Sequence, residues 1–136
     1  MRSIALLAAV ATVAAVAAGL SGCGLNVKLP DLFLLTRTGG GSKLSLIVND
    51  GGQITCNGGK QKTLASSQLI TARDLADNLA GDAKAGLTIP ASRGSVYSYR
   101  VKLQQGTIAF PDRAATTHRY LGQVEAFALQ AAQQYC

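Results

Sequence analysis

Charged and metal-binding side chains are scarce in this chain of 136 residues. Only 15% of the residues are charged, 13 Lys and Arg stand against 7 Asp and Glu, and no long run of either sign occurs. This balance, with 48% hydrophobic residues, excludes an acidic disordered chain and a basic nucleic-acid-binding tail. One His and three Cys leave few ligands for a metal centre, so we expect no metal and no cofactor. The length fits one domain.

The first 22 residues have the three parts of a secretory signal. Arg2 gives a positive start, Ile4 to Leu20 is apolar and uncharged, and small residues follow. The apolar run has 17 residues, fewer than the ~20 that a membrane-spanning helix needs. We therefore expect residues 1–22 to be a signal peptide that is removed from the mature protein.

The segment Leu20-Ser21-Gly22-Cys23 resembles the lipobox of bacterial lipoproteins at all four positions. A thiol at Cys23 can carry a diacylglyceryl group through a thioether, and the small residues before it give the peptidase access to the backbone. The resemblance implies a protein cleaved before Cys23 and held by acyl chains such as palmitate on the extracytoplasmic face of the cell membrane. The Ala- and Gly-rich sequence is also similar in style to small lipoproteins of high-GC, actinobacterial type. The alternatives are an ordinary secretory signal and a single-pass anchor that contains a cysteine.

Residues 23–30 then form the lipidated cysteine and a short tether, and residues 31–136 form the domain. A tether of this length keeps the domain close to the membrane. The surplus of basic side chains favours anionic headgroups or acidic wall polymers. We expect the partner to be an envelope protein, a polymer or a small ligand. Nucleic acid is not expected, because no compact basic stripe interleaved with aromatic residues is present.

Cys56 and Cys136 remain once Cys23 is assigned to the lipid. Two cysteines in an oxidising compartment allow one intramolecular disulfide, which would join the middle of the chain to its last residue. The alternatives are two free thiols or an intermolecular pair.

Hydrophobic periodicity predicts strands and helices in a repeated order. Three extended segments, at 32–37, 43–50 and 53–56, precede a helix that begins near Ser66 and carries apolar residues at helical spacing. A second hairpin, Tyr97 to Phe110, precedes a helix at the C-terminus. We expect an α+β domain in which an antiparallel sheet of about five strands has both helices on one face, in the order strand-strand-strand-helix-strand-strand-helix.

Such a sheet leaves its other face open to solvent. Every second residue of one strand is expected to face the helices, namely Tyr97, Tyr99, Val101 and Leu103. Arg100 and Lys102 alternate with them and should therefore point to the open side. The loops from Thr38 to Lys43 and from Gly86 to Ser95, the second with Pro90 and Arg93, are the other places where a partner could bind. These four residues, Arg100, Lys102, Pro90 and Arg93, are the predicted partner-binding residues.

No pattern of catalytic residues is recognisable, so we expect a non-catalytic binding module and no enzyme. The remaining alternative is a hydrolase that uses His118. His118 would need a nucleophile and an orienting carboxylate nearby, and Asp112 is the nearest acid in sequence.

Ile54-Thr55-Cys56, followed by a Gly-rich turn and a helix with Ala72-Arg73-Asp74-Leu75-Ala76, is similar to the secreted subtilisin-inhibitor family. That resemblance implies a protease inhibitor that presents the Pro90 loop. The family's helix carries a cysteine bridged to the strand, and the helix here has none.

Overall fold

The computed structural model describes residues 31–136, so the expected signal peptide, Cys23 and the tether lie outside the described residues. The elements are β1 (Asp31–Gly39), β2 (Ser42–Asn49), β3 (Gln53–Cys56), β4 (Gln61–Thr63), α1 (Ser66–Lys84), β5 (Tyr97–Leu103), β6 (Gly106–Pro111), a 3-10 turn η1 (Asp112–Thr116) and α2 (Arg119–Tyr135). The predicted α+β class is confirmed.

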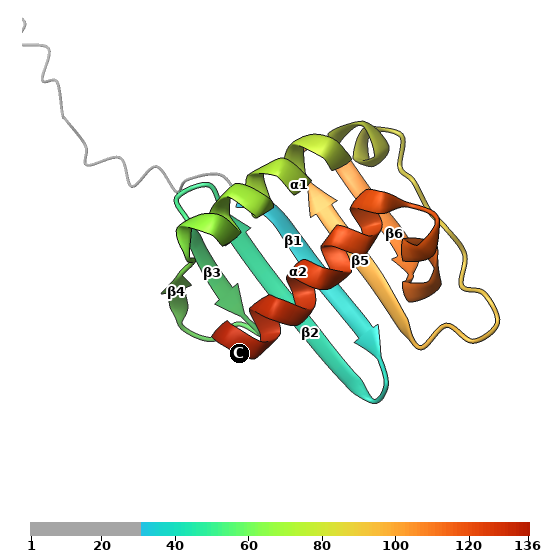
Figure 1. The fold of residues 1–136 in the computed structure, drawn as a ribbon, viewed down its shortest axis with the longest axis horizontal. Coiled ribbons are helices and arrows are strands. Elements are labelled where there is room, and N and C mark those ends of the chain that lie inside the picture. The colour runs from blue at the N-terminus through green and yellow to red at the C-terminus, as the bar shows by residue number, and fades with distance from the viewer. Residues whose placement is uncertain (1–30) are drawn as a thin grey trace, which may run out of the picture.

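One antiparallel sheet contains all six described strands in the order β4-β3-β2-β1-β5-β6 (Figure 1). The sequence predicted about five strands, and the additional one is β4. Its three residues are all exposed, so it carries no buried-and-exposed alternation that a sequence could reveal. The two repeated hairpins, β2–β3 and β5–β6, lie on either side of the central β1.

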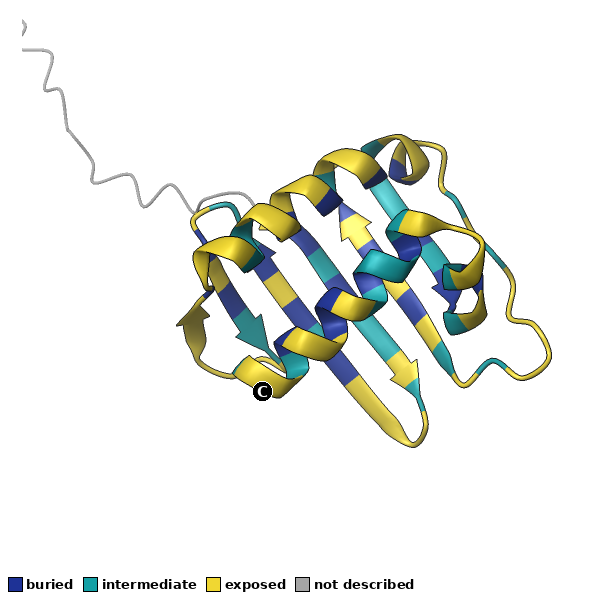
Figure 2. Ribbon diagram, in the orientation of Figure 1, coloured by how far each residue is buried: buried dark blue, intermediate teal, exposed yellow. Residues whose placement is uncertain are grey.

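Both helices pack on the same face of this sheet (Figures 1 and 2). Each forms because its apolar residues recur every three or four positions and so make one stripe. The residues buried by α1 are Ala72, Leu75, Leu79 and Ala83, and those buried by α2 are Leu121, Val124, Phe127, Ala128 and Ala131. The small residues in both stripes let the helix backbones approach the sheet closely.

The core lies between the helices and the sheet. The rings of Phe33 and Phe127 meet edge to face at 5.6 Å between centroids, which joins β1 to α2. Tyr99 stacks on Phe110 at 5.2 Å across the β5–β6 pair. Full burial of a side chain such as Leu46 stabilises the fold by about 1.5–3 kcal/mol.

The Cys56–Cys136 disulfide fastens the C-terminus to β3, with 5.6 Å between the two Cα atoms. The predicted pairing is therefore confirmed. Nearby, the Lys62 ammonium donates to the Tyr135 carbonyl oxygen at 2.7 Å, and the Ala65 amide donates to the Tyr135 hydroxyl at 3.0 Å. The end of α2 is thus joined covalently and by hydrogen bonds to the β3–β4–α1 region.

Gly106 is required where the β5–β6 turn meets the end of α1. Its φ is +156°, and a Cβ at this position would overlap the carbonyl oxygen of Ala83. The glycine therefore lets the hairpin lie directly against the helix.

Candidate binding face and polar clusters

The face of the sheet opposite the helices, here called the open face, is formed by the outward residues of each strand. Their orientation follows from the alternation along the strands, in which every second residue is buried under the helices. The open face contains cations, hydroxyls and aliphatic side chains, among them Leu34, Thr36, Thr38, Lys43, Ser45, Ile47, Thr55, Ser98, Arg100, Lys102, Thr107 and Ala109. The only acidic residue within any described strand is Asp31, the first residue of β1.

Arg100 and Lys102 are both exposed on the open face. Val101, between them, and Tyr99, just before Arg100, are buried. The pairing register sets Arg100 opposite Thr36 and Lys102 opposite Leu34 on β1. Lys43, on β2, is exposed on the same face, opposite Thr38. Among residues 31–136 the one ion pair joins Arg73 to Asp50, so the three cations of the open face have no carboxylate partner there.

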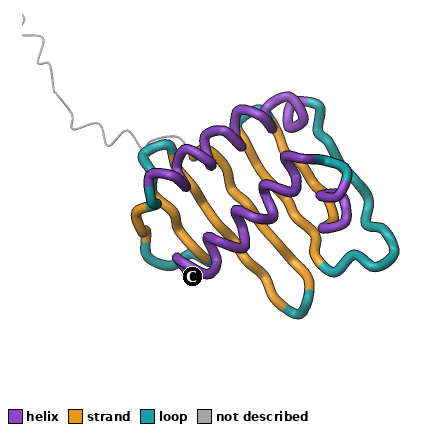
Figure 3. Tube along the Cα trace, in the orientation of Figure 1, coloured by secondary structure: helices purple, strands orange, loops and turns teal. Residues whose placement is uncertain are grey.

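A long loop joins α1 to β5 (Figure 3). Pro90 and Arg93 are exposed residues of this loop. The first part of the loop runs along the outer edge of β6, where the Ile89 amide donates to the Ala109 carbonyl oxygen at 2.8 Å. The Ala109 amide donates in turn to the Leu87 carbonyl oxygen at 3.0 Å. At the other end, the Asp112 carboxylate accepts the amides of Val96 and Tyr97 at 3.1 and 3.2 Å. The loop is therefore fixed to the domain at both ends.

This loop and the open face together form a groove of about 270 Å³. Ile89 and Ala91 line it from the loop, and Thr36, Thr38, Ser98 and Arg100 are among the residues that line it from the sheet. The structure thus brings Arg100 beside the loop that contains Pro90. Lys102 lines a different hollow with Asp31 and Leu34, and Arg93 lines neither of these two.

A cluster of charged and phenolic side chains, which the sequence reasoning missed, lies on the helix side of the sheet. The Arg37 guanidinium lies 4.9 Å from the centre of the Tyr97 ring. Burial raises the pKa of the Tyr99 phenol, and the nearby Glu125 adds to this rise. Glu125 is the sole glutamate of the chain, and its position among the apolar residues of α2 was the available signal.

Glu125 has an unusual carboxyl group. Burial, reinforced by the negative charge of Asp112, raises its pKa from 4.5 to about 7. Its Oε1 atom is buried and has no hydrogen-bond partner among the described residues. Burial also acts to raise the pKa of Asp112, but hydrogen bonds from the amides of Val96, Tyr97 and Arg113 outweigh it and lower that pKa.

His118 is exposed and immediately precedes α2. The Asp112 carboxylate, the acid that could have oriented it, accepts three backbone amide hydrogen bonds instead. Within residues 31–136, no three His, Cys, Asp or Glu side chains gather as metal ligands would.

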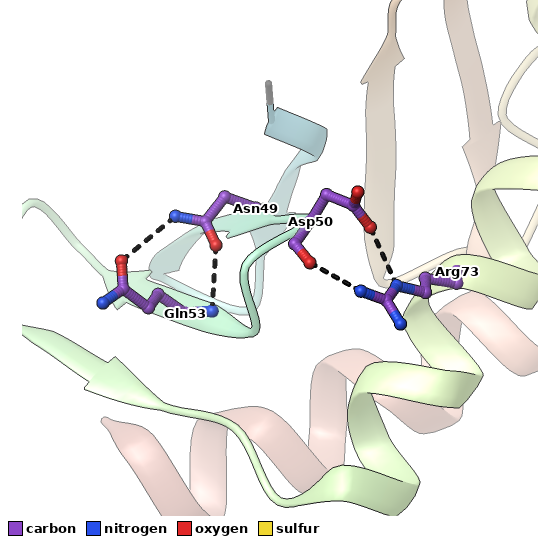
Figure 4. A network of polar contacts seen from close by, with 4 residues as sticks. All are labelled: Asn49, Asp50, Gln53 and Arg73. Carbon is purple, nitrogen blue, oxygen red and sulfur yellow. Dashed lines mark hydrogen bonds and ion pairs between the residues drawn. The ribbon is translucent and has the colours of Figure 1, made fainter. Parts of the chain in front are cut away.

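A further polar network holds the β2–β3 turn against α1 (Figure 4). Arg73 donates from Nε to the Asp50 carboxylate and from Nη2 to the Asp50 carbonyl oxygen, each at 2.8 Å. Asn49 accepts the Gln53 amide at 3.0 Å and closes the turn. The two hydrogen bonds from Arg73 to Asp50 therefore give these two residues a structural role.

Neither a family model, nor a curated protein, nor a solved structure matches this chain. In the part of the chain that the structure describes, no helix is both long and apolar enough to cross a membrane.

Proposed function

We propose that this protein is a lipid-anchored, non-catalytic binding module on the extracytoplasmic face of the cell membrane, and that its open face holds an envelope partner. The observation that carries the proposal is the open face itself, where Lys43, Arg100 and Lys102 are exposed and have no carboxylate partner among the residues that the structure describes. Unpaired cations on one face create a positive field that attracts and orients an anionic partner.

The anchor is proposed from the lipobox-like segment that ends at Cys23. Two acyl chains give stable attachment, because each buried methylene contributes ~0.8 kcal/mol and one chain alone binds reversibly. The eight peptide steps from Cys23 to Asp31 span at most about 29 Å, since an extended chain covers ~3.3–3.6 Å per residue. A partner held on the open face is therefore kept near the membrane surface.

Lysine footprinting tests the binding face in the native envelope, where the partner is present whatever its identity. Envelopes from cells that produce the protein naturally, and the purified full chain, are treated with the same acetylating reagent, and modification is measured by mass spectrometry. We expect Lys43 and Lys102 to be several-fold less reactive in envelopes. Lys84, exposed at the end of α1 on the helix side, is the internal control and should react equally in both samples. Equal reactivity of all three lysines would contradict the proposal.

A second candidate function is protease inhibition by the Pro90 loop. It is favoured by one observation, the attachment of the loop at both ends while Pro90 to Gly94 stays exposed. A loop held rigidly before binding loses little conformational freedom when it enters an enzyme. This candidate would be favoured if the full chain inhibited a subtilisin-type protease and Arg93→Gly abolished the inhibition. Cleavage of the loop without inhibition would exclude it.

A further inference from the structure

We propose that the occupant of the open face is a linear polyanion of the envelope in which phosphodiester groups alternate with short polyol units. The chain would lie at Arg100 in the groove between the Pro90 loop and strands β1 and β5, and would extend over the open face to Lys102 in one direction and to Lys43 in the other. This inference rests on the proposed function and specifies the partner.

The positions of the cations favour a repeating anion. Arg100 and Lys102 are two residues apart on one strand, which sets their Cα atoms about 6.8 Å apart along β5. Lys43 lies on β2, two strands from β5, and is level with Ser98, so its Cα is about 12 Å from that of Arg100 and farther from that of Lys102. A single small anion cannot reach all three side chains, whereas a chain with successive phosphates can contact each in turn.

The lining of the groove favours a polyol phosphate over other polyanions. The hydroxyl groups of Thr36, Thr38 and Ser98 can donate to phosphate oxygens and accept from polyol hydroxyls. Ile89 and Ala91 provide an apolar wall for the carbon atoms of the polyol. The planar Arg100 guanidinium has paired N–H donors and can bind two oxygens of one phosphate.

The shape of the site argues against a membrane surface as the occupant. The loop segment at Ile89 and Ala91 lies beside Ser98 and Arg100, so Arg100 lies in the wall of a groove. A flat bilayer cannot enter a groove, whereas a flexible chain can.

The test is a binding titration of the oxidised full chain, in a zwitterionic detergent, with a poly(glycerol phosphate) of defined length. We expect saturable binding that weakens as salt is added, because exposed charges are screened. Arg100→Glu with Lys102→Glu should weaken binding about tenfold or more. The matched control, Lys84→Glu with Arg119→Glu, makes the same change in net charge at exposed positions on the helices and should keep the affinity within about twofold.

A charge-neutral variant tests the groove itself. Ser98→Trp fills the groove from β5 and suits a strand, so the fold should persist while binding falls about tenfold. The proposal would be overturned if Ser98→Trp bound the polymer with unchanged affinity, or if poly-glutamate bound equally well. It would also be overturned if anionic lipid vesicles bound equally well and this binding were lost in the Arg100 and Lys102 variant. Protection of Lys43 and Lys102 in envelopes, combined with no affinity for the polymer, would overturn this inference and leave the proposed function standing.

Discussion

At the scale of the residue, adjacent side chains of strand β5 point to opposite faces of the sheet, so one stabilises the core and the next is exposed. Val101 is 1% exposed beneath the helices, while its neighbours Arg100 and Lys102 point to solvent on the other side of the sheet. The same short stretch of chain therefore contains both a core residue and two residues of the open face. Substitutions at these positions should have opposite effects.

We predict that Arg100→Glu with Lys102→Glu changes the free energy of unfolding by less than about 0.5 kcal/mol, as surface substitutions usually do. Val101→Asp should lower it by about 3 kcal/mol or more, because a carboxylate would be buried against apolar side chains. Thermal or urea unfolding of both variants measures the difference. A harmless Val101→Asp, or severe unfolding of the Arg100 and Lys102 variant, would contradict the assignment of the two faces.

Glu125 should make stability depend on pH. Its pKa is about 7 in the folded protein against an ordinary 4.5, so the native state binds the proton more tightly than the unfolded state. The free energy of unfolding should therefore fall as the pH rises from about 4.5 to 7 and level off above.

Glu125→Gln should remove the pH-dependent decrease in the free energy of unfolding and stabilise the protein at pH 8 by about 1 kcal/mol. This gain is smaller than the full pKa shift would give, because water screens the half-buried carboxylate. Urea unfolding across this pH range measures it, with Asp82→Asn on α1 as the control. A variant with the unaltered pH profile would show that Glu125 is not the responsible group.

At the scale of the element, the C-terminal helix depends on the disulfide as well as on its apolar stripe. Cys136 directly follows α2, and its bond to Cys56 closes a loop with a sequence separation of 80 residues. Constraining so long a loop removes much of the conformational freedom of the unfolded chain. The end of α2 then remains beside β3, where Tyr135 and Lys62 hydrogen-bond.

Reduction should lower the free energy of unfolding by roughly 4 kcal/mol. Urea unfolding with and without reductant measures this, and the double variant Cys56→Ala with Cys136→Ala should be equally destabilised and insensitive to reductant. Two free thiols in the denatured, non-reduced chain would contradict the pairing.

The elements that the sequence predicted are those with a clear period. The strict alternation from Tyr97 to Leu103 and the helical spacing from Leu69 to Ala83 identify strand and helix, because local sterics and burial act together there. The same alternation placed Arg100 and Lys102 on the open side.

The groove and the Glu125 cluster could not be predicted in this way. The groove depends on the hydrogen bonds that Ala109 makes with Ile89 and Leu87, and the cluster combines residues from β1, β5, η1 and α2. Contacts between residues so far apart in sequence leave no periodic signal. Strand β4 is too short and too polar to leave one either.

At the scale of the whole molecule, the acidic side chains are distributed unevenly, because Asp31 is the only one that lies within a described strand. The open face has three cations with no carboxylate partner within residues 31–136, whereas the exposed side of α1 carries Asp74, Asp77 and Asp82. An anionic partner is therefore attracted to one side of the domain and repelled from the α1 surface. A lipid anchor at Cys23 would keep this field within a short distance of the membrane.

The most direct test of this account is the membrane attachment of a Cys23→Ala variant. Cells that produce the wild-type chain or the variant are labelled with a clickable fatty-acid analogue and then fractionated. We predict that the wild-type protein takes the label and sediments with membranes, and that Cys23→Ala takes no label and remains an unprocessed or mislocalised precursor. A Cys23→Ala protein that is still labelled and still fractionates with membranes in its mature form would contradict the lipid anchor.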